Sequence, residues 1–154
     1  YSAASFGSCE ESMGKNDDLP DFHAKRKILF GDKTSDEQLR ETGQQFMEGE
    51  RYDDALEFFQ RAEADDLARQ VARRAMERGN TPLYMRAKRV LGEPISEDEW
   101  VGLAQSAERA ELYTAARLAY QKAGRTQEAE RLAELIFGPE EEDEPVEEEA
   151  AEQG

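Results

Sequence analysis

Residues 35–62 read SDEQLRETGQQFMEGERYDDALEFFQRA, a stretch that opens with a helix cap and then places apolar side chains at helical spacing. Ser35 and Gln38 have the pattern of a capping box, in which the serine hydroxyl accepts from a free amide and the fourth residue reaches back to the cap. Apolar residues that recur at this spacing line one face of a helix, which is then buried. The stretch therefore predicts two short helices joined by a turn.

The same pattern returns 61 positions further along the chain, without a gap. Ser35 corresponds to Ser96, Tyr52 to Tyr113 and so on through the identical pairs Gln44–Gln105, Glu50–Glu111, Ala55–Ala116, Gln60–Gln121, Ala62–Ala123, Ala68–Ala129 and Ala72–Ala133. This period is about two hairpin units of roughly 30 to 34 residues, the spacing expected of a helical solenoid.

Start and stop signals predict seven helices in this zone. Pro82 suits a first helical turn, and Gly79, Gly92 and Gly124 suit helix ends. The predicted helices cover residues 35–49, 52–63, 65–78, 82–91, 96–110, 113–123 and 126–137. The chain is therefore predicted to be all-α.

Two segments resemble the tetratricopeptide repeat. The first has Leu39, Gly43 and Phe46, then Tyr52 and Ala55, then Phe59 and Ala62; the second has Trp100, Leu103 and Ala104, then Tyr113 and Ala116, then Tyr120 and Ala123. The small residues would let paired helices approach closely, and the aromatic ones would fill the space between one hairpin and the next. The hairpin between the two segments lacks the signature aromatics.

The resemblance covers roughly residues 35–137 and implies an α-solenoid of about three antiparallel hairpins. Helix 126–137 would cap the stack by covering its last apolar face. The family binds partners on the inner helix of each hairpin. Transferred to this chain, the partner-binding positions are Arg40, Gln44, Met47, Arg69, Arg73, Arg74, Val101, Gln105 and Arg109.

Composition divides the chain into three zones. Residues 1–33 form an N-terminal extension, in which Phe22–Phe30 is interpreted as a docking helix, a partner-binding motif or neither. Residues 34–137 form the repeat domain. Residues 138–154 hold nine acidic residues and no basic ones, so we expect a disordered acidic tail.

The formal net charge of −16 disfavours nucleic acid and anionic membranes as partners. No apolar run approaches the roughly 18 residues that span a bilayer. Cys9 is the only cysteine and His23 the only histidine, so we expect no cysteine or histidine metal site, no catalytic residues and no cofactor. A cytoplasmic location is the simplest interpretation.

A basic run stands out against this charge. Seven basic residues and one acid, Glu77, fall within residues 69–89; the basic ones are Arg69, Arg73, Arg74, Arg78, Arg86, Lys88 and Arg89. One interpretation is a solvated face that forms salt bridges with neighbouring helices. The other is a surface for an acidic peptide or a chain terminus, because the planar guanidinium matches a carboxylate. The acidic tail either folds back over this run or serves only as a solubilising segment.

The sequence therefore predicts a protein-interaction module or adaptor that holds a peptide or helix of another protein, and not an enzyme. Two alternatives stay open. The chain is a structural subunit that self-associates by stacking hairpins, or a non-catalytic accessory subunit of an enzyme complex.

Overall fold

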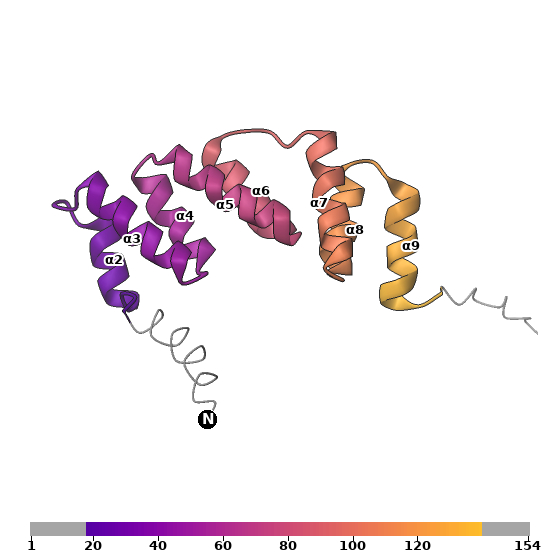
Figure 1. The fold of residues 1–154 in the computed structure, drawn as a ribbon, viewed down its shortest axis with the longest axis horizontal. Helices are drawn as coiled ribbons and strands as arrows, with labels where there is room; N and C mark the ends of the chain where they lie inside the picture. Colours follow the sequence, from indigo (N-terminus) through magenta and orange to yellow (C-terminus); the bar gives the residue numbers. More distant parts are fainter. Residues whose placement is uncertain (1–17, 140–154) are drawn as a thin grey trace, which may run out of the picture.

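A computed structural model describes residues 18–139, and every regular element in this part of the chain is an α-helix. The described part holds eight helices, and they are set side by side along the molecule (Figure 1). They are α2 (Phe22–Phe30), α3 (Asp36–Glu48), α4 (Tyr52–Arg61), α5 (Asp65–Arg78), α6 (Thr81–Leu91), α7 (Glu97–Arg109), α8 (Tyr113–Lys122) and α9 (Thr126–Phe137). The seven predicted helices are confirmed with boundaries within two residues.

Local capping chemistry sets where the helices begin. Ser35 and Ser96 both form complete capping boxes, with Gln38 and Glu99 as the reciprocal partners. The side chain of Asn80 accepts from the Leu83 amide at the start of α6. These bonds satisfy amide groups that have no partner within the helix, so each start is fixed by residues close in sequence.

The helices pack in sequential pairs, α3 with α4, α5 with α6 and α7 with α8, an arrangement consistent with stacked hairpins. Neighbouring pairs then meet through α4 and α6, through α6 and α8, and through α5 and α7. This produces one row of helices, with α2 at one end and α9 at the other (Figure 1). The last helix packs against α8.

The 61-residue period is visible in the backbone as well as in the sequence. Glu50 and Glu111 end α3 and α7 with left-handed φ values of 60° and 59°. At the ends of α4 and α8, Glu63 and Gly124 adopt φ values of 51° and 75°. The unit α3–α4–α5 is therefore repeated by α7–α8–α9, and α9 takes the place that α5 takes in the first copy.

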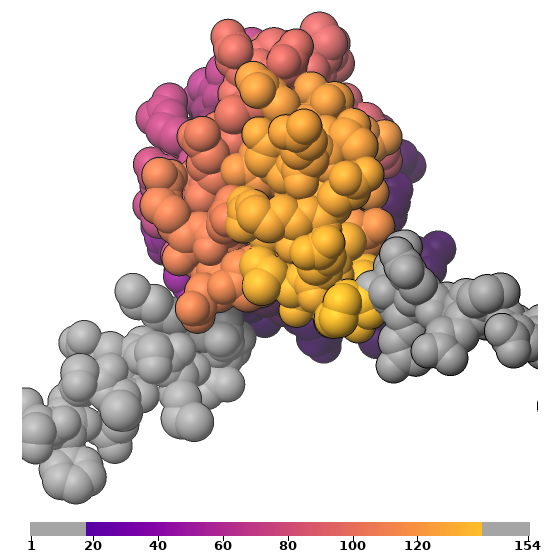
Figure 2. Space-filling model, turned by 90° about the vertical axis from the view of Figure 1, so that its right-hand side faces the viewer, coloured from indigo at the N-terminus to yellow at the C-terminus, as the bar shows by residue number. Residues whose placement is uncertain are grey.

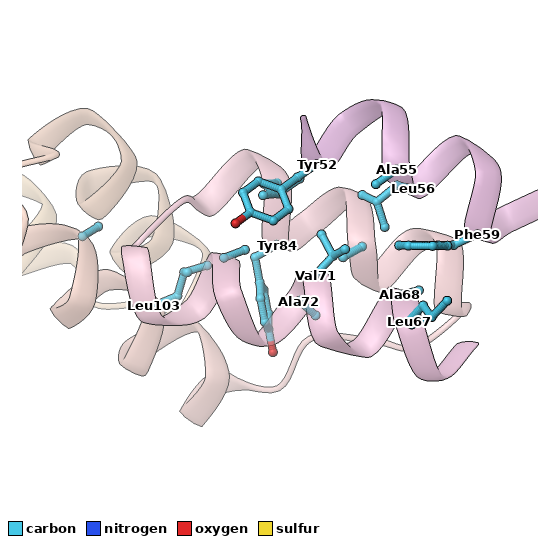
Figure 3. Close-up of a cluster of buried hydrophobic side chains, with 14 of the residues drawn as sticks. Tyr52, Ala55, Leu56, Phe59, Leu67, Ala68, Val71, Ala72, Tyr84 and Leu103 are labelled. Atoms are coloured by element: carbon cyan, nitrogen blue, oxygen red, sulfur yellow. The ribbon is translucent and has the colours of Figure 1, made fainter. Parts of the chain in front are cut away.

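One continuous core of buried apolar side chains runs between the pairs. In Figure 3, Leu56 and Phe59 of α4 face Val71 and Ala68 of α5, and all four side chains are buried. Within the first hairpin, a Cβ atom on Gly43 would lie 2.5 Å from Phe59 Cε1. This confirms that a small residue there lets the two helices approach.

The place of Phe46 differs from the expectation that it fills the space between hairpins. Its ring stacks on Phe58 inside the α3–α4 hairpin, with centroids 5.3 Å apart. At the corresponding position of α7 stands Ala107, and the backbone of Gly79 packs directly against it. The preceding hairpin thus occupies the volume that an aromatic ring would need.

None of the described helices is both long enough and apolar enough to cross a membrane.

Candidate interaction surface

The residues predicted to bind a partner lie on α3, α5 and α7, which are the first helices of the three hairpins. Leu67, Val71 and Ala75 of α5 are buried, whereas Arg69, Arg73 and Arg74 are exposed. The three arginines therefore lie on the side of α5 opposite its buried apolar residues. The three helices are neighbours, because α5 contacts α7 and an ion pair links α5 to α3.

Two of the predicted arginines form ion pairs within the described residues. Arg40 of α3 donates two hydrogen bonds to the Asp66 carboxylate of α5, at 3.1 and 2.9 Å. Arg69 of α5 lies 2.6 Å from Glu93 in the segment that follows α6. The first pair links the α3–α4 hairpin to the α5–α6 hairpin, and the second links α5 to the segment after α6, so both arginines are only partly available to a ligand.

Much of the basic run is paired in the same way. Arg78 lies 2.8 Å from Glu50 and over the ring of Tyr52. The hydrogen bond from Arg78 holds the pKa of Glu50 below its ordinary value. Arg86 lies 2.8 Å from Asp53. For these residues the interpretation as a face with salt bridges is correct.

A tighter network surrounds Glu99 at the start of α7. Lys88 lies 3.0 Å from this carboxylate, and the Tyr84 hydroxyl donates to it at 2.7 Å. Burial alone would raise the pKa of Glu99, but the hydrogen bonds from the Ser96 amide, Tyr84 and Lys88 lower it to about 2. Burial and the same hydrogen bond raise the pKa of Tyr84. The network joins α6 to α7 and is a structural link.

Arg73 and Arg74 are different. Both are exposed, and neither forms an ion pair with any residue in the described part of the chain. Arg89 of α6 is also exposed and makes no ion pair within the same range. No ion pair within residues 18–139 therefore uses the guanidinium donors of these three arginines.

The remaining predicted residues divide into two groups. Gln44 and Gln105 are exposed and correspond to each other across the repeat, whereas Met47 and Val101 are half-buried. Met47 packs against the core, and Arg109 donates to Ser106 Oγ of its own helix at 3.2 Å. The structure thus provides a polar face with arginines at its centre. Phe58 of α4 lies entirely in the core and takes no part in this face.

A second surface was missed by the sequence prediction. An open groove of about 790 Å³ lies over α8, and its lining includes Pro82, Leu112, Tyr113, Arg117, Leu118 and Ile136. The Nε atom of Arg117 is buried without a hydrogen-bond partner among the described residues. The sequence does contain a sign of this groove. Leu112 and Leu118 stand 61 positions after the charged residues Arg51 and Glu57, so apolar residues replace charged ones at equivalent positions of the repeat.

Two predicted features lie outside the described residues. These are Cys9 and the acidic segment from residue 140 onward, including its predicted contact with the basic run. Within residues 18–139, no group of three or more histidine, cysteine, aspartate or glutamate side chains is arranged to hold a metal ion.

Comparisons with protein-family models, with curated proteins and with solved structures gave no match to this chain.

Proposed function

We propose that this chain is a tetratricopeptide-like interaction module. Its ligand is an acidic peptide or helix of another protein, bound on the face formed by α3, α5 and α7. The proposal is supported by the sequential helix pairs, by the 61-residue period in backbone and sequence, and by the spacing of aromatic and small residues in the two outer hairpins. A row of this kind presents an extended surface whose side chains are held by rigid helices.

The observation that carries the proposal is the pair Arg73 and Arg74. In a chain with a net charge of −16, two adjacent guanidinium groups are exposed on one helix without an ion-pair partner among residues 18–139. The neighbouring helices carry many carboxylates, but none of those in residues 18–139 forms an ion pair with Arg73 or Arg74. The two arginines are therefore available to an incoming anion. A planar guanidinium binds a carboxylate with two parallel hydrogen bonds, which fixes orientation as well as adding affinity.

The roles of the surrounding residues follow from their geometry. Arg40 and Arg69 hold α3 and the segment after α6 against α5, so they keep the face rigid. Gln44 on α3 and Gln105 on α7 flank the arginines and provide hydrogen bonds to a peptide backbone. Met47 and Val101 provide apolar contact at the edge of the core. Affinity then comes from apolar contact, and orientation comes from the arginines.

The proposal is tested by reversing the charge of the arginine pair in the full chain. The variant Arg73→Glu/Arg74→Glu is immobilised beside the wild type, and proteins retained from a lysate of the source are identified by mass spectrometry. Binding of a labelled polyglutamate peptide is measured in parallel by fluorescence anisotropy. We expect the variant to lose acidic partners and to bind the peptide at least tenfold more weakly.

The matched control is Arg61→Glu/Lys122→Glu, which makes the same change in net charge on α4 and α8. Both control residues are exposed and form no ion pair within the described residues. If the control loses the same partners as the arginine variant, net charge and not this face determines binding. In that case the proposed function is wrong.

A further inference from the structure

Large apolar side chains are exposed at both ends of the row. Among the described residues, Phe22 and Phe30 of α2 are 70% and 65% exposed, and Leu112, Leu135 and Phe137 near the other end are 46%, 61% and 74% exposed. These five are the large hydrophobic side chains left exposed in the described part of the chain. Figure 2 looks onto the end formed by α9.

The groove over α8 corresponds to a surface that is covered in the first copy. Thr114 and Leu118 line the groove, and they stand 61 positions after Asp53 and Glu57 of α4. In the first copy α6 packs on α4, and its Arg86 lies against Asp53 and Glu57. The groove is therefore the place that a helix of the α6 type would occupy on α8 and α9.

The chain contains a second helix of the α6 type, and it is α2. Shifting α2 by 61 positions overlays Phe22 on Leu83, Lys25 on Arg86 and Phe30 on Leu91, without a gap. Leu83 is 5% exposed because α6 covers the preceding helices, whereas Phe22 is 70% exposed. One end of the row thus lacks an α6-type helix. The other end is an α6-type helix, and its Phe22, at the position where α6 covers the preceding helices, is uncovered.

The acidic segment is a poor substitute for such a helix. The same shift places Glu144, Pro145 and Glu148 at the positions of Leu83, Tyr84 and Ala87, which are the buried apolar residues of α6. Glutamates at buried positions would lose their hydration without a compensating partner, and a proline inside the helix would remove a backbone hydrogen bond. Helix α2 places Phe22, His23 and Arg26 at the same three positions, so it has an apolar side chain at the first of them and no proline.

Charge favours α2 as that helix. Between residues 22 and 30 the chain carries Lys25, Arg26 and Lys27 and no acid. Lys25 is held by Asp54 and Glu57 of its own chain, but Arg26 and Lys27 are exposed, and the groove lining supplies the carboxylate of Glu111.

We infer that two copies of this chain associate head to tail, with α2 of one copy seated in the groove between α8 and α9 of the other. The contact continues the period of the row across two molecules. It is heterologous, so it leaves a free groove and a free α2 and adds further copies as concentration rises. It uses the ends of the row and leaves the face of α3, α5 and α7 free, so it is independent of the proposed function.

The test separates the two sides of the contact. Phe22→Ser/Phe30→Ser removes the apolar side of α2, and Thr114→Lys/Leu118→Lys places two cations in the groove opposite a basic helix. Sedimentation velocity of the full chain is measured from micromolar to millimolar concentration. We expect the wild type to grow in mass with concentration, each variant to stay monomeric, and an equimolar mixture of the two variants to form a dimer and nothing larger.

The dimer in the mixture also shows that both variants fold, because each supplies the side that the other lacks. Gln44→Lys/Gln105→Lys is the charge-matched control on the other face and is expected to assemble like the wild type. Three results would overturn the inference: a wild-type mass independent of concentration, variants that assemble normally, or a mixture that stays monomeric. If only a chain without residues 140–154 assembles, that segment and not a second copy occupies the groove.

Discussion

Gly79 satisfies two separate constraints at a single residue. Its φ of 67° lies in the left-handed region, where it ends α5. A Cβ atom there would also lie 2.3 Å from the Cα and N atoms of Ala107 in α7. The first constraint is conformational and local, and the second is steric and depends on how two hairpins stack. Gly92 has a similar φ of 65° but open space around it.

Comparing Gly79→Ala with Gly92→Ala therefore separates the conformational cost of a left-handed residue from the steric cost of the close approach to α7. Gly92→Ala is expected to lower the free energy of unfolding by about 1 kcal/mol, the value for a non-glycine residue in the left-handed region. Gly79→Ala is expected to lower it by about 3 kcal/mol or more, because backbone atoms of α7 must also move. Urea unfolding followed by circular dichroism measures both. Equal losses would show that the close approach to Ala107 has no energetic weight.

Glu99 makes the stability of the α6–α7 contact depend on pH. Its pKa of about 2 in the folded chain lies below the ordinary value of 4.5. A lowered pKa stabilises the fold above the ordinary value, and this contribution is lost as pH falls from 4.5 toward 2. Glu99→Gln should remove on the order of 1 kcal/mol near neutral pH, a modest value because solvent screens this partly exposed group.

The expected signature is a difference between wild type and Glu99→Gln that shrinks across this acidic window. Chemical unfolding at a series of pH values measures it. Glu97→Gln is the control, because that side chain is exposed and lies 3.9 Å from its nearest cation, Arg125. If the difference between wild type and Glu99→Gln did not change with pH, the hydrogen-bond network would not lower the pKa of the Glu99 carboxyl in the folded chain.

At the scale of elements, the sequence predicts what is local and misses what depends on packing. The starts at Ser35 and Ser96 and the end at Gly79 could be predicted, because cap and turn chemistry involves residues within one turn. The groove over α8 and the partners of Arg69 and Arg86 could not, because ion pairs across 24 and 33 positions depend on how helices stack. The one sequence feature that indicates the groove is the leucine at position 118, where the equivalent position of the first copy has Glu57.

The first described helix, α2, is attached to the row by the ion pairs of Lys25 and by the apolar side chains Ile28 and Leu29. Lys25 lies 2.5 Å from Asp54 and 2.7 Å from Glu57 of α4, and Leu29 is buried beside them. Burial acts to lower the pKa of Lys25, but hydrogen bonds to Asp54 and Glu57 raise it, so the charge persists. A helix of nine residues is marginal by itself.

Lys25→Gln should therefore detach α2 without unfolding the row. Hydrogen exchange is expected to accelerate by at least tenfold in residues 22–30, whereas exchange in α5 stays unchanged. The matched control is Lys27→Gln, since Lys27 is exposed and forms no ion pair within the described residues. Acceleration in both variants would point to net charge, and acceleration in neither would show that Leu29 alone holds the helix.

In the whole molecule, contacts run mostly between helices that are neighbours in the row. Stability in such an array is a sum of unit and nearest-neighbour terms, so the ends open at lower free energy than the middle. Leu103 of α7 and Leu132 of α9 are both fully buried, but the first lies inside the row and the second in its last helix. The same substitution at these two positions compares the middle with the end.

Leu103→Ala should lower the global free energy of unfolding by about 2–5 kcal/mol, the range for a buried leucine truncated to alanine. Leu132→Ala loses the same side chain, but α9 can detach while α3 to α8 remain folded, so the global loss is limited to what α9 contributes. Hydrogen exchange should then rise throughout the row in the first variant and only in α8 and α9 in the second. Equal global losses with uniform exchange would show one cooperative unit, in which neighbour contacts do not govern stability.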